Sequence, residues 1–81
     1  MYTVETDERT DQQIVALPAA LAAFAQARAL VEIHPWSGDP IHRYNPKGAV
    51  RTLAFGSAGM IIYLVLEDLR RVDLLEVLWA G

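Results

Sequence analysis

The chain has 81 residues, of which 53% are hydrophobic and 21% charged, with a formal net charge of −3 and no cysteine. This composition predicts one small folded domain over residues 1–81 and excludes a disordered chain, a disulfide-stapled scaffold and a thiolate zinc site. No apolar run approaches the ~20 residues that a membrane-spanning helix needs, and no signal segment follows Met1. We therefore expect a soluble, cytoplasmic protein without a membrane partner.

Positive charge is concentrated in the middle of the chain. Residues 40–66 contain Arg43, Lys47 and Arg51 and no acid, whereas the segments on either side are net acidic. An acidic protein does not attract nucleic acid through its overall charge, so any contact with RNA would be local and centred on residues 43–51. The same three cations also suit an ordinary solvated surface, and the sequence leaves both interpretations open.

The N-terminal part of the chain predicts a strand followed by a short helix. Residues 2–6 alternate between apolar and polar side chains, which is typical of a strand. The helix after it ends near Leu17. It begins either at Thr10, which could form a capping box with Gln13, or earlier at Asp7.

A second, alanine-rich helix is predicted from Pro18 to Ile33, because proline suits the first position of a helix and Pro35 stops it. Its apolar residues recur at helical spacing and form a stripe that should face the core: Leu17, Leu21, Phe24, Ala27, Leu30 and Val31. Residues 35–48 show no periodic pattern. A loop of about 14 residues in so small a domain is more often functional or mobile than decorative.

The rest of the chain predicts three strands, over residues 49–55, 60–66 and 71–79, separated by short turns. With the N-terminal elements this gives the order β-α-α-β-β-β. The fold class is therefore α+β, with two helices packed on one face of a mainly antiparallel four-stranded sheet.

The last two predicted strands are apolar on both faces. An antiparallel sheet with one face in water should instead alternate between apolar and polar residues. Two short helices can cover only one face, so the other face must curl on itself, lie under the 35–48 loop or meet a partner; we favour a partner. The residues predicted to form that interface are Tyr63, Val77, Leu78 and Trp79.

Sequence motifs for hydrolysis, nucleotide binding or zinc binding are absent from the chain. His34 and His42 flank a turn that contains Asp39, a spacing more typical of surface residues than of a metal site, and we expect no metal and no cofactor. Arg51 is the most informative cation, because a guanidinium fixed on a strand beside a basic loop can bind a phosphate or carboxylate. An ion pair of Arg51 with an acid of the neighbouring strands (Glu67, Asp73 or Glu76) is the alternative.

Three tracts of the sequence resemble the RelE/ParE toxin superfamily: Val50-Arg51-Thr52-Leu53-Ala54-Phe55-Gly56, Ile61-Ile62-Tyr63-Leu64-Val65 and Val72-Asp73-Leu74-Leu75-Glu76-Val77. Members share an arginine near the second strand, a phenylalanine-glycine turn, an apolar-tyrosine-apolar third strand and a final apolar strand after an acidic turn. Residues 14–18 also resemble the end of the family's first helix. The resemblance extends over nearly the whole chain and implies a RelE/ParE-like fold.

The resemblance also implies a toxin of a type II toxin–antitoxin pair, held inactive by a cognate antitoxin. RelE-like members cut messenger RNA on the ribosome, a reaction that needs a base, cations around the phosphate and an acid for the leaving oxygen. By this resemblance Arg51 is the catalytic residue that contacts the phosphate, and Arg43 and Lys47 extend the RNA-binding surface.

The sequence departs from the RelE-like pattern in two places. Met60 stands where RelE-like members often carry an arginine, and residues 79–81 supply no Arg, His or Tyr. Whether the chain is an enzyme is therefore open. Three hypotheses follow: an mRNA-cleaving toxin, a ParE-like inhibitor of DNA gyrase without catalysis, and a toxin-derived interaction module that forms homodimers through its open sheet face.

Overall fold

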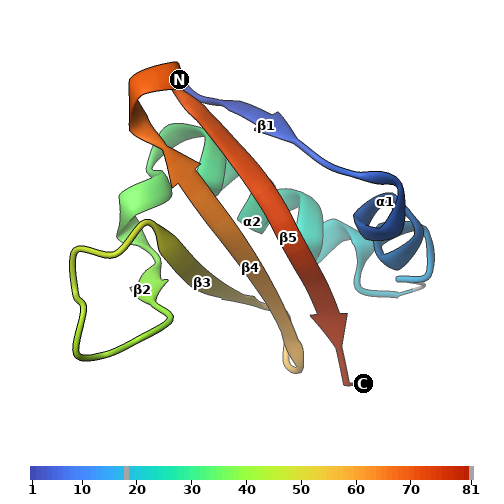
Figure 1. Cartoon of the computed structure of the whole chain (residues 1–81). Helices are drawn as coiled ribbons and strands as arrows, with labels where there is room; N and C mark the ends of the chain where they lie inside the picture. Colours follow the sequence, from blue (N-terminus) through green and yellow to red (C-terminus); the bar gives the residue numbers. More distant parts are fainter. Residues whose placement is uncertain (18, 81) are drawn as a thin grey trace.

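A computed structural model describes residues 1–17 and 19–80 and has the predicted α+β architecture, a single sheet with helices packed against it (Figure 1). The elements in chain order are β1 (Thr3–Glu5), α1 (Glu8–Val15), α2 (Leu21–Ile33), a 3-10 turn (Pro35–Ser37), β2 (Asp39–Pro40), β3 (Val50–Phe55), β4 (Gly59–Leu66), a second 3-10 turn (Glu67–Leu69) and β5 (Arg71–Trp79). None of the helices in this part of the chain has the length and apolar character needed to cross a membrane.

The sheet has five strands in the order β1-β5-β4-β3-β2, one more than predicted. β1 runs parallel to β5, and the other pairs are antiparallel. The additional strand, β2, consists of Asp39 and Pro40 and pairs with β3 at the edge of the sheet. Two residues, one of them a proline, carry no period-2 signal, so the sequence pattern assigns this segment to a loop.

Helix α1 begins at Asp7, the earlier of the two predicted starting points. The Asp7 carboxylate accepts a 2.7 Å hydrogen bond from the Thr10 backbone N–H, and this bond lowers the pKa of Asp7. A capping box between Thr10 and Gln13 is therefore wrong. Thr10 is instead fully buried, and its hydroxyl donates to the Leu74 carbonyl of β5.

Helix α1 also covers the edge of β5 beyond the short stretch that pairs with β1. Arg9 Nη2 donates to the Leu75 carbonyl at 3.1 Å, and Gln13 Oε1 accepts from the Val77 N–H at 2.8 Å. These bonds occupy backbone groups that an edge strand would otherwise present to another chain. This part of the β5 edge is therefore closed to strand pairing.

Helix α2 packs behind the sheet (Figure 1) and buries Phe24, Ala27 and Val31. Leu21 and Leu30, which the predicted stripe also included, are exposed. The helix ends at Ile33, two residues before Pro35, as predicted. Its predicted start at Pro18 lies outside the described residues.

The core lies between α2 and the sheet. Along β4, Ile61, Tyr63 and Val65 are buried on the helix side, and Val72 and Leu74 of β5 face the same layer. Ile62 and Leu64, which lie between the buried residues of β4, point to the opposite face, because side chains alternate along a strand. A bulge in the pairing of β4 and β5 breaks this alternation once, so that the chain has an extra residue at position 75.

Candidate nucleic-acid interface and partner face

The segment 41–49, between β2 and β3, carries the exposed cations of the predicted RNA-binding site. Arg43 and Lys47 both lie in water. The Arg43 guanidinium lies 5.0 Å from the ring centroid of Tyr44, and its Nη2 donates to the Tyr44 hydroxyl at 2.9 Å. The Tyr44 side chain is 86% exposed. A guanidinium beside an exposed aromatic ring offers both a phosphate ligand and a stacking surface for a base.

Arg51 lies in a different environment from Arg43 and Lys47. It is only 7% exposed, and its guanidinium donates to three backbone carbonyls that hold the loop against β3: Gly38 (3.0 Å from Nε, 2.8 Å from Nη2), Pro46 (3.2 Å) and Gly48 (3.0 Å). The same guanidinium lies 5.4 Å from the Trp36 ring centroid. Arg51 thus positions the basic loop, and its predicted contact with a phosphate stays a prediction.

The alternative interpretation of Arg51, an ion pair across the sheet, is wrong. The three acids considered for it pair with other arginines: Glu67 with Arg70 at 3.0 Å, Asp73 with Arg71 at 2.9 Å and Glu76 with Arg9 at 2.6 Å. Each of these pairs is at the surface, where ion pairs contribute little to stability. The Arg51 guanidinium is instead stabilised by hydrogen bonds to backbone carbonyl dipoles.

The face of the sheet opposite the helices is apolar at its centre, as the two-sided apolar pattern of the strands predicted. Strand register places its uncharged members side by side, and we call them the open sheet face: Val50, Thr52, Ala54, Met60, Ile62, Leu64, Leu66 and Leu78. On β5 the same side of the sheet also carries Arg71, Asp73 and Glu76, in register with Leu66, Leu64 and Ile62. Met60 and Leu78 pair across β4 and β5 and are 39% and 46% exposed. Exposed apolar side chains in one continuous patch are typical of an interaction surface.

The predicted interface residues divide between the two faces. Leu78 lies on the open sheet face. Tyr63 and Val77 are wrong as interface residues, because alternation directs them into the core, where both are buried. Trp79 is half-buried on the helix side, with its ring stacked on Phe55 at a centroid distance of 5.9 Å.

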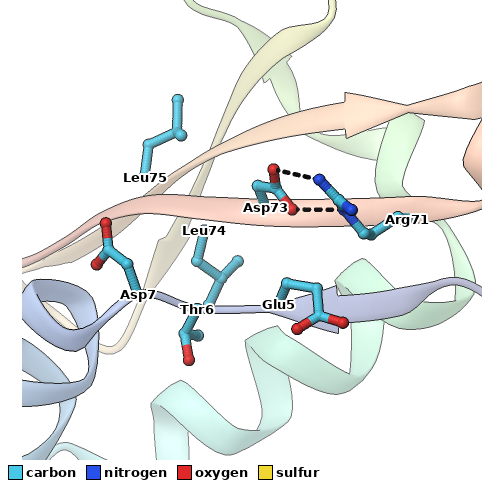
Figure 2. A pocket seen from close by; sticks show the side chains of 7 residues that line it. All are labelled: Glu5, Thr6, Asp7, Arg71, Asp73, Leu74 and Leu75. Atoms are coloured by element: carbon cyan, nitrogen blue, oxygen red, sulfur yellow. Dashed lines mark hydrogen bonds and ion pairs between the residues drawn. The ribbon is translucent and has the colours of Figure 1, made fainter.

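A hollow of about 500 Å³ opens where β1 diverges from β5. Figure 2 shows its lining: the acids Glu5, Asp7 and Asp73, the uncharged Thr6, Leu74 and Leu75, and a single cation, Arg71. Arg71 is held by Asp73 through two hydrogen bonds of 2.9 and 3.1 Å, which raise the pKa of Arg71. The hollow is therefore net acidic.

Sequence reasoning missed one polar cluster, which joins the N-terminal segment to the turn between β4 and β5. The Glu67 carboxylate accepts from the Tyr2 hydroxyl at 2.6 Å, from Trp36 Nε1 at 2.7 Å and from Arg70 at 3.0 Å. These bonds lower the pKa of Glu67, the one from Tyr2 most. The residues are far apart in sequence, so no spacing could have revealed the cluster.

Across residues 1–17 and 19–80, no group of three or more His, Asp or Glu side chains is placed to hold an ion. His34 ends α2 and His42 lies in the basic loop, and both are exposed.

The arrangement of elements is a RelE/ParE-like fold, which confirms the predicted fold. The chain is similar to the crystal structure of the isolated E. coli RelE toxin, with a TM-score of 0.82 and 15% sequence identity over 100% of this chain and 86% of that one. It is also similar to a chain of the intact E. coli RelBE toxin–antitoxin complex, with a TM-score of 0.80 and 15% identity over 100% of this chain and 99% of that one. No family model and no curated protein sequence matches the chain.

Proposed function

We propose that this protein is the toxin, or a toxin-like component, of a type II toxin–antitoxin pair. The observation that supports this most directly is the agreement of its fold with that of the RelE toxin over the whole chain. The similarity extends to a toxin–antitoxin complex, and a cognate antitoxin is therefore the partner that we propose. The open sheet face, with Met60 and Leu78 exposed, offers an apolar surface to such a partner.

For the action of the toxin, we propose contact with ribosome-bound messenger RNA through the basic loop. Arg43 and Lys47 supply cations for phosphate, and Tyr44 supplies an exposed ring for stacking. Arg51 is assigned to holding the loop in shape, because its N–H groups already donate to carbonyls. Strand cleavage would further require a general base and a general acid, and we assign neither role to a residue of this chain.

Controlled expression in a bacterial host tests the proposal. Growth arrest with cut ribosome-bound messages supports a RelE-like toxin, whereas arrest with damaged DNA and intact messages supports a gyrase inhibitor. Absence of both effects, with soluble protein present, contradicts the toxin proposal and favours a non-catalytic interaction module.

The role of the basic loop is tested by a matched pair of variants. The double variant Arg43→Glu/Lys47→Glu should abolish message cutting, because charge reversal repels the phosphate backbone. Arg28→Glu changes an exposed cation on α2 and should leave cutting intact. If both variants cut messages as well as the wild type, the loop would be excluded from RNA binding.

A further inference from the structure

We propose that Trp36 is a positioning residue that couples the basic loop (residues 41–49) to the Glu67 carboxylate. The indole N–H of Trp36 donates to Glu67, and its ring lies beside the Arg51 guanidinium that holds the loop. Loss of the contact with Glu67 would therefore loosen the loop on the other side of Arg51. To call this loop an RNA-binding site rests on the proposed function, whereas the coupling is argued from the contacts alone.

The first end of the coupling is a carboxylate with both oxygens occupied. Glu67 Oε1 accepts from the Tyr2 hydroxyl at 2.6 Å and from Trp36 Nε1 at 2.7 Å, and Oε2 accepts from Arg70 at 3.0 Å. Hydrogen bonds to an ionised group are the stronger ones, so a carboxylate fixed by two further donors can hold the indole in one orientation. The Glu67 and Arg70 side chains are 46% and 59% exposed, so this end of the coupling lies at the surface.

The backbone of the turn that carries Trp36 is held on both sides. The Pro35 carbonyl accepts from the buried Tyr63 hydroxyl at 2.6 Å. After Trp36, the Ser37 hydroxyl and backbone N–H both donate to the His34 carbonyl, at 2.7 and 3.1 Å. Because the main chain is fixed on either side, the indole side chain is the part of the turn that connects Glu67 with Arg51.

The second end of the coupling is the Arg51 guanidinium, which lies 5.4 Å from the centroid of the Trp36 ring. This distance is within the ~6 Å range of a cation–π interaction, which is strongest where water is excluded, and Arg51 is only 7% exposed. The guanidinium is planar and donates to the carbonyls of Gly38, Pro46 and Gly48 at the same time. The Trp36 ring limits the positions that this plane can adopt, and therefore favours the one that reaches all three carbonyls.

Backbone amides inside the loop can report on this coupling, because their exchange with solvent measures how often the loop opens. Three amides of the loop donate to backbone carbonyls, and we call them the reporter amides: Ile41 to Val50 at 3.1 Å, Asn45 to His42 at 2.8 Å and Gly48 to Asn45 at 3.0 Å. They lie in the segment whose ends Arg51 holds. If Trp36 keeps Arg51 in place, a change at Glu67 should reach these amides.

Amide hydrogen exchange of the purified full chain, followed by NMR, tests the coupling without any RNA. Trp36→Phe keeps an aromatic ring and removes the N–H donor, and Glu67→Ala removes the acceptor. Each variant should speed exchange of the reporter amides about fivefold, because each removes one contact of the coupling. The Phe24 amide of α2, which donates to the Ala20 carbonyl at 3.0 Å, should change less than about twofold.

Matched variants separate this coupling from a general loss of stability. Asp68→Ala changes the exposed acid next to Glu67, and Trp79→Phe changes the other tryptophan, whose ring is stacked on Phe55. Both control variants should leave the exchange of the reporter amides unchanged. If Trp36→Phe speeds the Phe24 amide as much as the reporter amides, it lowers the stability of the whole domain, and the proposal is overturned.

The double variant Trp36→Phe/Glu67→Ala tests whether the two residues act through one another. If the effect of Glu67 passes through the indole N–H, the double variant should exchange no more than about twofold faster than the faster single variant. Exchange that rises by the product of the two single effects would mean that Glu67 and Trp36 act on the loop independently, and would overturn the proposal. Wild-type exchange of the reporter amides in Glu67→Ala would also overturn it.

The proposed function and this coupling can fail separately. If the reporter amides respond as expected while Arg43→Glu/Lys47→Glu still cuts messages, the role of the loop in RNA binding is contradicted and the coupling is supported. If the wild type cuts messages but Trp36→Phe and Glu67→Ala leave the reporter amides unchanged, the coupling alone is contradicted.

Discussion

The Arg51 guanidinium and the Gly38 carbonyl are joined by two hydrogen bonds, of 3.0 Å from Nε and 2.8 Å from Nη2. Gly38 precedes the edge strand β2, and Arg51 lies in β3, which pairs with β2. The same guanidinium also reaches the carbonyls of Pro46 and Gly48 on the far side of the basic loop. One side chain thus joins both ends of a segment that has little regular structure.

We predict that Arg51→Ala lowers the free energy of unfolding by about 2–4 kcal/mol, because it leaves buried carbonyls without donors and removes charge-assisted hydrogen bonds. Arg28→Ala, at an exposed position of α2, should change stability by less than about 0.5 kcal/mol. Urea denaturation of the two variants measures the difference. If Arg51→Ala were as stable as the wild type and inactive, the predicted catalytic role of Arg51 would regain support.

The strands were predictable because their apolar residues are continuous and bounded by turns. β5 begins and ends where the pattern indicated, and α2 ends before Pro35. The pattern could not tell which face of β4 points inward, since every residue from Met60 to Leu66 is apolar or aromatic, and the bulge at residue 75 breaks the alternation along β5. That ambiguity is why Tyr63 and Val77 were assigned to an interface although they lie in the core.

The candidate site was predictable only where the side chains are exposed. Arg43 and Lys47 lie in water because their loop is polar and contains turn residues. The environment of Arg51 was not predictable, because its acceptors are main-chain carbonyls whose directions depend on how the loop folds. The role of Tyr44 as a stacking surface could have been predicted, since an aromatic residue next to Arg43 in a basic loop is typical of base stacking.

Gly38 should tolerate no side chain. A Cβ at this position would lie 2.7 Å from the Thr52 carbonyl oxygen and would also overlap the Tyr63 hydroxyl. We predict that Gly38→Ala destabilises the protein by about 1–3 kcal/mol through this overlap. Gly48→Ala is the matched control, because its closest neighbour is the flexible Asn45 side chain. Thermal unfolding that ranks Gly48→Ala as the more harmful change would contradict the prediction.

Tyr63 combines complete burial with a satisfied hydroxyl, which donates to the Pro35 carbonyl at 2.6 Å. Burial raises the pKa of Tyr63, so the hydroxyl stays protonated as a donor at neutral pH. Tyr63→Phe should lower the free energy of unfolding by about 1–2 kcal/mol, because the carbonyl loses its partner. Tyr44→Phe, in the exposed loop, should have no measurable effect on stability. If Tyr63→Phe left the free energy of unfolding unchanged, the Pro35 carbonyl would have found another donor.

The Glu67 cluster should make stability depend on pH in the acid range. Hydrogen bonds from Tyr2, Trp36 and Arg70 favour the carboxylate and lower its pKa below the ordinary value of 4.5. Because the folded-state pKa is the lower one, the stabilisation is complete above pH 4.5 and is lost as the pH falls through the folded-state pKa. Wild type should therefore be more stable than Glu67→Gln at pH 7, and this difference should shrink towards pH 3.

Urea midpoints of the wild type and Glu67→Gln between pH 3 and pH 7 test this sign. Asp68→Asn is the control, because Asp68 is the adjacent exposed acid and is not an acceptor for Tyr2, Trp36 or Arg70. The difference between wild type and Asp68→Asn should change less with pH than the difference between wild type and Glu67→Gln. If the difference in urea midpoint between wild type and Glu67→Gln stayed constant or widened on acidification, the donors Tyr2, Trp36 and Arg70 would not favour the ionised carboxylate. The contact between the N-terminal strand and the β4–β5 turn would then depend on the Arg70 guanidinium, which lies 4.3 Å from the centroid of the Tyr2 ring.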